Sequence, residues 1–186
     1  MTHRTAAELE AHLDQLRAAP AEVGTLDLVV RRPAVDEREI LDEGTLDLAD
    51  GLVGDNWLSR QTSHAIAEGR HLKAQLNVMS ARMVGFLGET VDERALAGDQ
   101  LFLDLDLSVA NLPTGARLAI GDSDNPAVIE VTDKPHNGCA KFRARFGEAA
   151  LEFVNSPVGK ELRLRGFNAR VVAPGVVRPG DKVTRL

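Results

Sequence analysis

Apolar residues recur at every second position in several short stretches of the chain, which is the pattern of strands with one buried face. The clearest stretch is Thr25-Leu26-Asp27-Leu28-Val29-Val30-Arg31, and residues 38–48 form a second, divided by the turn signal Asp42-Glu43-Gly44. Further strands are predicted over residues 74–80, 100–107, 116–120, 127–132, 167–173 and 181–186. The chain therefore consists mainly of short strands.

Glycine, aspartate and proline mark the turns between these strands. A Gly/Asp-rich loop spans residues 50–57, where we expect Asp55 to cap the turn and Trp57 to cover the core. A polar turn is predicted over residues 121–126, and Pro174-Gly175 and Pro179-Gly180 are predicted to join the last strands.

Helical signals are fewer. Thr5-Ala6-Ala7-Glu8 is a capping box, and the apolar stripe that follows it predicts a helix that Pro20 ends, with His12 off the stripe and solvated. Short helices are also predicted over residues 81–87, 140–146 and 148–154, and another begins with Ser156 as N-cap and Pro157 as first residue.

The order of these elements favours a mostly β fold, a β-rich α+β domain built on a closed or partly closed β-barrel with several short helices. A chain of 186 residues suits one such domain. We expect residues 21–186 to form it and residues 1–20 to be an appended N-terminal helix.

Composition restricts the class of protein. The chain has no run of 18 apolar residues and no signal-peptide pattern near Met1, so we expect a cytoplasmic protein that does not enter a membrane. One cysteine excludes an intramolecular disulfide and a cysteine-rich zinc site. His64 and His71 lie seven residues apart without a third ligand nearby, which is weak support for a metal site.

Charge is unevenly distributed along the chain, whose net charge is −6. Residues 130–186 carry 11 Lys/Arg against 6 Asp/Glu, whereas residues 1–129 carry 11 against 22. The acidic total argues against a nucleic-acid binder, which needs a basic face. It leaves room for a local cationic pocket that binds a small anion.

The cysteine lies in the cationic part of the chain. Cations and a helix N-terminus stabilise a thiolate, the reactive form of a cysteine. Cys139 follows Gly138 and precedes the predicted helix 140–146, on which Arg143 lies one turn away, while Lys141 and Arg145 point elsewhere and line the surroundings. His136 is a further candidate hydrogen-bond partner. The alternative is that Cys139 is a small buried apolar residue without chemistry.

Several segments, taken together and in order, resemble the MOSC-domain proteins, a family named after the C-terminal part of molybdenum cofactor sulfurases. The similarity covers residues 45–186. The segments are Asp50-Gly51-Leu52-Val53-Gly54-Asp55, residues 74–79, Leu96-Ala97-Gly98-Asp99-Gln100-Leu101, residues 112–121, the cysteine loop 135–147, residues 166–175 and Gly180-Asp181.

This resemblance implies a β-barrel fold and a function tied to the molybdenum cofactor. In members that are enzymes, the cysteine at the position of Cys139 ligates molybdenum, and N-hydroxylated substrates are reduced. A thiolate suits such a metal, and the cationic loop suits the phosphate of the pterin. The implied cofactor-binding residues are His136, Asn137, Lys141, Arg143, Arg145 and Arg165, with Arg170 as a further phosphate candidate.

The chain also departs from the family pattern. Many members have Pro or Arg directly before the cysteine, where this chain has Gly138, which leaves the ligand geometry open. The pyridoxal-phosphate domain of full sulfurases is absent, so no pyridoxal phosphate is expected. Three functions remain: a molybdenum-dependent oxidoreductase with a small-molecule substrate and a separate electron-donor protein, a sulfur carrier with a Cys139 persulfide, and a non-enzymatic anion-binding domain.

Overall fold

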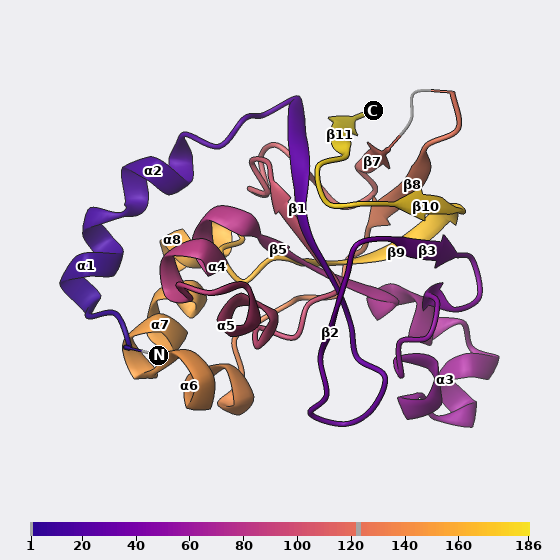
Figure 1. Cartoon of the computed structure of the whole chain (residues 1–186), viewed down its shortest axis with the longest axis horizontal. Helices are drawn as coiled ribbons and strands as arrows, with labels where there is room; N and C mark the ends of the chain where they lie inside the picture. The colour runs from indigo at the N-terminus through magenta and orange to yellow at the C-terminus, as the bar shows by residue number, and fades with distance from the viewer. Residues whose placement is uncertain (1, 122–123) are drawn as a thin grey trace.

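Seven strands close into a mixed β-barrel, which confirms the predicted fold class (Figure 1). The computed structural model describes residues 2–121 and 124–186. Around the barrel the strands follow the order β11-β7-β8-β9-β5-β6-β1, and pairing of β1 with β11 closes the ring. Neighbours are antiparallel except β5 and β6, which run parallel. β2 extends the sheet beyond β1, and β10, β3 and β4 form a separate small sheet.

Most strands lie where the alternation predicted them, but β6 is shorter than the predicted 100–107, and β4 lies in the predicted loop 50–57. The strands are β1 Val23–Arg31, β2 Glu39–Leu41, β3 Gly44–Asp47, β4 Gly51–Leu52, β5 Leu76–Ser80, β6 Leu101–Asp104, β7 Arg117–Ile120, β8 Ala127–Val131, β9 Phe167–Ala173, β10 Gly175–Val177 and β11 Lys182–Arg185. The helices are α1 Ala6–Ala11, α2 Leu13–Arg17, α3 Ser63–Ala67, α4 Ala81–Leu87, α5 Val91–Ala95, α6 Ala140–Phe146, α7 Glu148–Asn155 and α8 Pro157–Glu161, with 3-10 turns η1 Leu58–Arg60 and η2 Arg70–Ala74.

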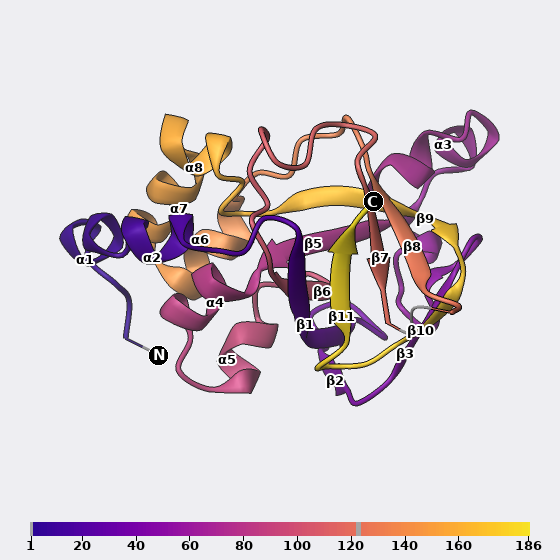
Figure 2. The ribbon, with the colours of Figure 1, turned by 90° about the horizontal axis from the view of Figure 1, so that it is seen from above.

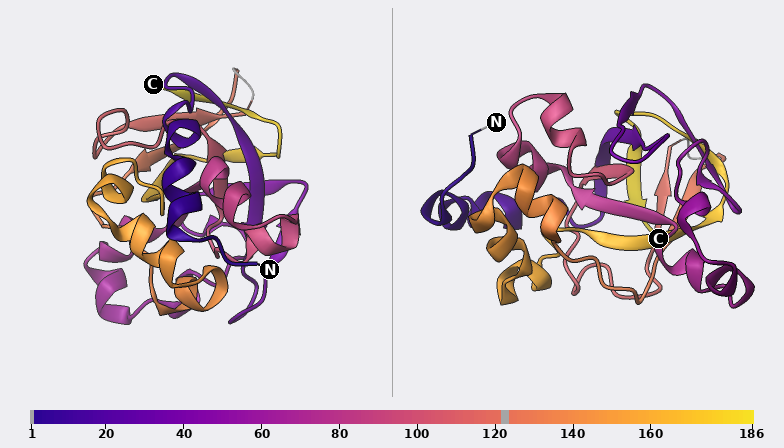
Figure 3. Two further views of the ribbon diagram at one scale, coloured as in Figure 1. Left: turned by 90° about the vertical axis from the view of Figure 1, so that its left-hand side faces the viewer. Right: turned by 90° about the horizontal axis from the view of Figure 1, so that it is seen from below.

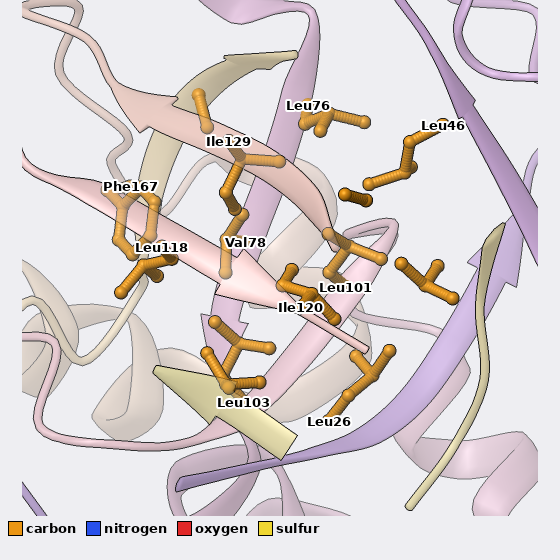
Figure 4. Packing of buried hydrophobic residues seen from close by; sticks show 14 of the residues in the cluster. Leu26, Leu46, Leu76, Val78, Leu101, Leu103, Leu118, Ile120, Ile129 and Phe167 are labelled. Carbon is orange, nitrogen blue, oxygen red and sulfur yellow. The ribbon is translucent and has the colours of Figure 1, made fainter. Parts of the chain in front are cut away.

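Leucine, isoleucine and valine side chains fill the barrel. Figure 4 shows side chains from different strands pointing toward one another in its interior, among them Leu26, Val78, Leu101 and Ile129. All four are fully buried. Burying such a side chain stabilises the fold by roughly 1.5–3 kcal/mol, so this cluster is the main source of barrel stability.

A β-bulge at Asp27 gives β1 two apolar faces. The pairing with β6 skips Asp27, so that Leu26 and Val29 point into the barrel while Leu28 and Val30 point outward. The outward residues belong to a second core, shared with β5, β6 and most of the helices. Figures 1 and 2 show α1, α2 and α4–α8 gathered on one side of the barrel, with α3 alone at the other end.

The N-terminal segment packs onto this helical layer. The Thr5–Glu8 capping box is confirmed, and Leu9 is fully buried in the second core. The predicted single helix is instead two short helices that meet at His12. The prediction of a solvated His12 is wrong, because its ring stacks on Phe86 with 3.9 Å between ring centroids. Figure 3 shows α1, in indigo, beside α7, in orange.

Several local predictions are confirmed and others are corrected. Asp55 accepts a hydrogen bond from the Trp57 amide at 2.9 Å, and Trp57 is buried, as predicted. The Ser156 cap and first-position Pro157 of α8 are also confirmed. The predicted Pro174-Gly175 turn is wrong at its second residue, where β10 begins and pairs with β3. Part of the predicted turn over 121–126, namely 122–123, lies outside the described residues.

The helices of the described residues are all too short or too polar to span a lipid bilayer.

Candidate functional site

The cysteine loop forms one wall of a cavity of about 180 Å³ on the helical side of the barrel. Segments distant in sequence supply the rest: the end of β1, the loop before β2, the loop after β4, Asn77 on β5 and the loop before β6. We call it the Cys139 cavity. Its lining includes Arg32, Asp36, Arg38, Asn56, Arg60, Asn77, Gly98, Cys139, Lys141, Phe142, Arg145 and Arg165.

Asn155 holds the cysteine loop in place. Its side-chain oxygen accepts from the Gly138 amide at 2.9 Å, and its amide nitrogen donates to the Gly138 carbonyl at 3.2 Å. A Cβ on Gly138 would lie 2.8 Å from Leu151, so glycine permits α7 to pack this closely. Cys139 then occupies the N-cap position of α6, with an exposed side chain that makes no capping hydrogen bond. Its thiol is accessible.

Two cations of α6 point to the same side as Cys139. Lys141 donates to Asp36 at 2.8 Å, and Arg145 lies 3.4 Å from the same carboxylate. The hydrogen bond from Lys141, helped by the charges around it, lowers the pKa of Asp36. Arg145 also donates to the Leu96 carbonyl at 2.6 Å, which fixes its guanidinium at the cavity edge.

The opposite wall adds arginines that lack carboxylate partners. Among the described residues, neither Arg38 nor Arg60 has an acidic side chain within ion-pair distance. Burial lowers the pKa of Arg38, and the charges of Arg145 and Arg32 act in the same direction. The pKa of Arg60 is lowered by burial and by Arg32. Concentrated like charge of this kind favours an anion in the cavity.

Two buried ion pairs hold the floor. Arg32 makes a bidentate contact with Asp55, with both hydrogen bonds at 2.8 Å. Arg165 binds both oxygens of Asp99, at 2.8 and 2.6 Å, and its guanidinium carbon lies 5.0 Å from the ring centre of Phe142. The six lining cations exceed the three carboxylates Asp36, Asp55 and Asp99, which leaves a formal charge of +3.

Buried polar atoms without partners lie in the same place. Among the described residues these are Arg38 Nε, Asn56 Oδ1, Trp57 Nε1 and Arg165 Nε. A buried donor that lacks an acceptor costs about 1–3 kcal/mol. Three of the four belong to residues that line the Cys139 cavity, and two of these, Arg38 Nε and Arg165 Nε, are donors that a bound ligand with acceptor atoms would satisfy.

His136 completes the Asp99 cluster from the other side. Its Nε2 lies 2.7 Å from Asp99 Oδ1. Burial by itself raises the pKa of Asp99, but the charges and hydrogen bonds of Arg165 and His136 outweigh it and lower the pKa. Burial and the Arg165 charge lower the pKa of His136 against the opposing effect of Asp99. The imidazole is therefore neutral at pH 7, donates from Nε2 and keeps Nδ1 as an acceptor.

The lowered pKa of His136 predicts a pH dependence of stability. Below its ordinary pKa of 6.5 the unfolded chain binds a proton on this imidazole that the folded chain does not. The free energy of unfolding should thus fall as pH drops through 6.5, by up to about 1.4 kcal/mol per pH unit for each such group. His12, whose pKa burial also lowers, contributes in the same window.

Urea unfolding between pH 7 and pH 5 measures this slope. His136→Gln should flatten the slope, because a group that protonates only on unfolding has been removed. His64→Gln is the matched control, since His64 is exposed. Equal slopes for wild type and His136→Gln would show that His136 does not cause the dependence.

The predicted site residues divide into three groups. Cys139, Lys141, Arg145 and Arg165 line one cavity together. His136 and Asn137 line a neighbouring cavity, described below. Two cations lie outside both: Arg143 is 3.5 Å from Glu148, and Arg170 pairs with Glu130 on the barrel surface. The predicted orientation of the α6 side chains is therefore wrong. Lys141 and Arg145 line the Cys139 cavity, whereas Arg143 points away from it.

Four residues of the cavity were not predicted from the sequence: Arg32, Arg38, Arg60 and Asn56. They lie in the acidic part of the chain, whose net charge does not indicate an anion site. A signal was nevertheless present, because Arg32 follows a predicted strand and Asp55 belongs to the Gly-Asp turn. Buried partners of opposite charge are expected where two such turns meet.

The protein is a closed mixed β-barrel with one accessible cysteine in a cationic cavity. The family model for the MOSC domain matches residues 74–184. The chain belongs to the MOSC domain family. No curated protein sequence matches it.

Solved structures share the fold. The chain is similar to the YuaD protein from Bacillus subtilis, with a TM-score of 0.58, 14% identity and coverage of 87% of this chain and 94% of that one. It is also similar to YiiM from Escherichia coli, with a TM-score of 0.51, 20% identity and coverage of 87% and 69%. At these identities the likeness concerns the fold.

Proposed function

We propose that the Cys139 cavity binds the molybdenum cofactor, with the Cys139 thiolate as a ligand of molybdenum. The observation that carries this proposal is an accessible thiol inside a cavity of formal charge +3, in a chain of a family associated with that cofactor. Soft thiolate ligands suit molybdenum, and cationic side chains suit its oxo groups and the pterin phosphate.

The residues of the cavity fit such a group. The unpartnered nitrogens of Arg38 and Arg165 are donors for an oxyanion, and Lys141 and Arg145 share one carboxylate that an anion could replace. The cavity volume of about 180 Å³ is below the roughly 300–1,000 Å³ of complete small-molecule sites. The cavity would therefore hold only the anionic end of such a cofactor.

We further propose that the protein reduces N-hydroxylated small molecules. When bound, a molybdenum centre would supply the chemistry for removing the hydroxyl oxygen from the substrate. This reduction consumes two electrons and two protons and yields the amine or base and one water molecule. The residues of this chain bind and orient the ligand. Lys141 and Arg145 hold negative charge near Cys139, and Asn77 accepts a hydrogen bond from Arg32 and so fixes this guanidinium on the floor. The electrons come from a separate protein, because the chain has no flavin or iron–sulfur ligand pattern.

Metal analysis tests the proposal. The protein is purified from a host that makes the molybdenum cofactor, and molybdenum and pterin are quantified per chain. Wild type should approach one molybdenum per chain, and Cys139→Ala should fall to background, because the thiolate ligand is lost. Molybdenum in wild type no higher than in Cys139→Ala would contradict the assignment.

Substitutions at two arginines of α6 test where the phosphate of the pterin binds. Arg145→Gln should lower pterin occupancy, since Arg145 lines the cavity, whereas Arg143→Gln should not, since Arg143 lies outside it. The opposite result would favour Arg143 as a cofactor ligand, as the sequence pattern suggested.

A sulfur carrier is the second candidate, and the exposed, uncapped thiol favours it, because a partner can reach it. Cys139 would then carry a persulfide, visible as an adduct of about +32 Da on the peptide that contains it. In a third case the domain binds anions without catalysis, and Cys139→Ser would leave that binding intact.

A further inference from the structure

A second cavity, of about 280 Å³, lies on the other side of Arg165. The loop that follows β8 forms one wall, and α8 with the turn after it forms the opposite wall. We call it the His136 cavity. The residues that matter for its chemistry are Lys134, His136, Asn137, Lys160, Arg163 and Arg165.

The cavity is positively charged, and most of its cations have no acidic partner in the part of the chain that the structure describes. Its acidic residue, Asp133, is engaged by Lys73 at 2.7 Å, and Asp99 neutralises Arg165. Among the described residues, Lys134, Lys160 and Arg163 have no carboxylate within ion-pair distance. Burial lowers the pKa of Arg163, as expected for a cation that is desolvated without a counter-charge.

The floor of the cavity is Arg165, whose side chain is 8% exposed and pairs with Asp99. Arg163 has a φ of 47° because it follows α8 in a Schellman turn, in which the Leu164 amide donates to the Gly159 carbonyl at 2.8 Å and the Arg163 amide to the Lys160 carbonyl at 3.2 Å. This turn fixes the backbone from which the Arg163 side chain reaches the cavity lining.

His136 adds a hydrogen-bonding group to the same cavity. Because its Nε2 donates to Asp99, Nδ1 is the ring nitrogen left for a ligand, and the Asp99 contact fixes the orientation of the ring. A neutral imidazole in this tautomer accepts a hydrogen bond from a protonated ligand oxygen, such as the hydroxyl of a monoprotonated phosphate.

We propose that the His136 cavity is a binding site for a small phosphate-bearing molecule, held by Lys134, Lys160 and Arg163 and oriented by His136. Three unpaired cations match the negative charge and several acceptor oxygens of a phosphate group. This site is separate from the Cys139 cavity, and the proposal does not depend on whether Cys139 holds a metal.

Titration with inorganic phosphate tests the site, with backbone amide resonances as the readout and chloride added to keep ionic strength constant. Saturable shifts are expected for the amides of residues 133–134, 136–137 and 159–166. The double variant Lys134→Gln/Lys160→Gln, both exposed residues, should weaken phosphate binding about tenfold or more, because two charged hydrogen bonds are lost. Lys141→Gln, on the Cys139 cavity, is the matched control and should leave these shifts unchanged.

Two results would overturn the proposal: no saturable shift of these amides in the folded wild type, or a loss of binding in Lys141→Gln equal to that in the double variant. Metal analysis of Cys139→Ala is independent of both results, so failure of this site and failure of the molybdenum assignment can be told apart.

Discussion

Replacing Asp99 by alanine is expected to lower the free energy of unfolding by about 3–5 kcal/mol, because the substitution leaves a buried arginine without its counter-charge. Asp99 is fully buried and is the shared partner of Arg165 and His136. Without it, the Arg165 guanidinium would lie between two cationic cavities and keep two neutral acceptors, the Ala97 carbonyl at 3.2 Å and the Met79 sulfur at 3.7 Å.

Urea unfolding at pH 7 measures this loss, and Asp133→Ala is its control. Asp133 pairs with Lys73 at 2.7 Å, but both side chains are more than half exposed, so the expected loss there is much smaller than for Asp99. If both variants lost a similar amount of unfolding free energy, the buried ion pair of Asp99 would stabilise the protein no more than the exposed pair of Asp133.

Gly166→Ala is the second variant for which a large effect is expected. Gly166 precedes β9, where the strand meets β5, and has a φ of +96°. A Cβ at this position would lie 1.8 Å from the Val78 carbonyl oxygen, which belongs to the backbone and cannot move without disturbing the barrel. The unfavourable φ and the overlap together should cost about 2–5 kcal/mol.

Gly180→Ala separates the two contributions. Gly180 has nearly the same φ, +95°, but a Cβ there would meet no atom within 4 Å. The expected cost is therefore that of the backbone conformation alone, about 1–2 kcal/mol. Thermal or urea unfolding of both variants compares them directly, and equal losses would show that the contact with Val78 is relieved at no cost.

The strands of the barrel could be predicted from the sequence because each buries one face, and the alternation of apolar and polar residues records this. Segments without such a face were missed. α3, η1 and η2 bury no residue completely enough to leave a pattern. α5 was missed although Thr90 and Glu93 form a capping box like that of Thr5 and Glu8, so its signal was available.

The candidate site was predicted only where it is local in sequence. Cys139, Lys141 and Arg145 follow one another on one loop and helix, and the charge count pointed to them. The opposite wall, with Arg38 and Arg60, depends on how distant loops meet once the barrel closes. Their role follows from packing, and no spacing in the sequence expresses it.

The bulge at Asp27 has a consequence for how the molecule opens. Since Leu26 and Val29 belong to the barrel core and Leu28 and Val30 to the second core, one strand takes part in both. The helices cannot detach without exposing the outer face of β1, and the barrel cannot open without releasing its inner face. The two cores therefore form one cooperative unit, and the amides of Val29 and Val30 should exchange with solvent at the same slow rate, through the same global unfolding event.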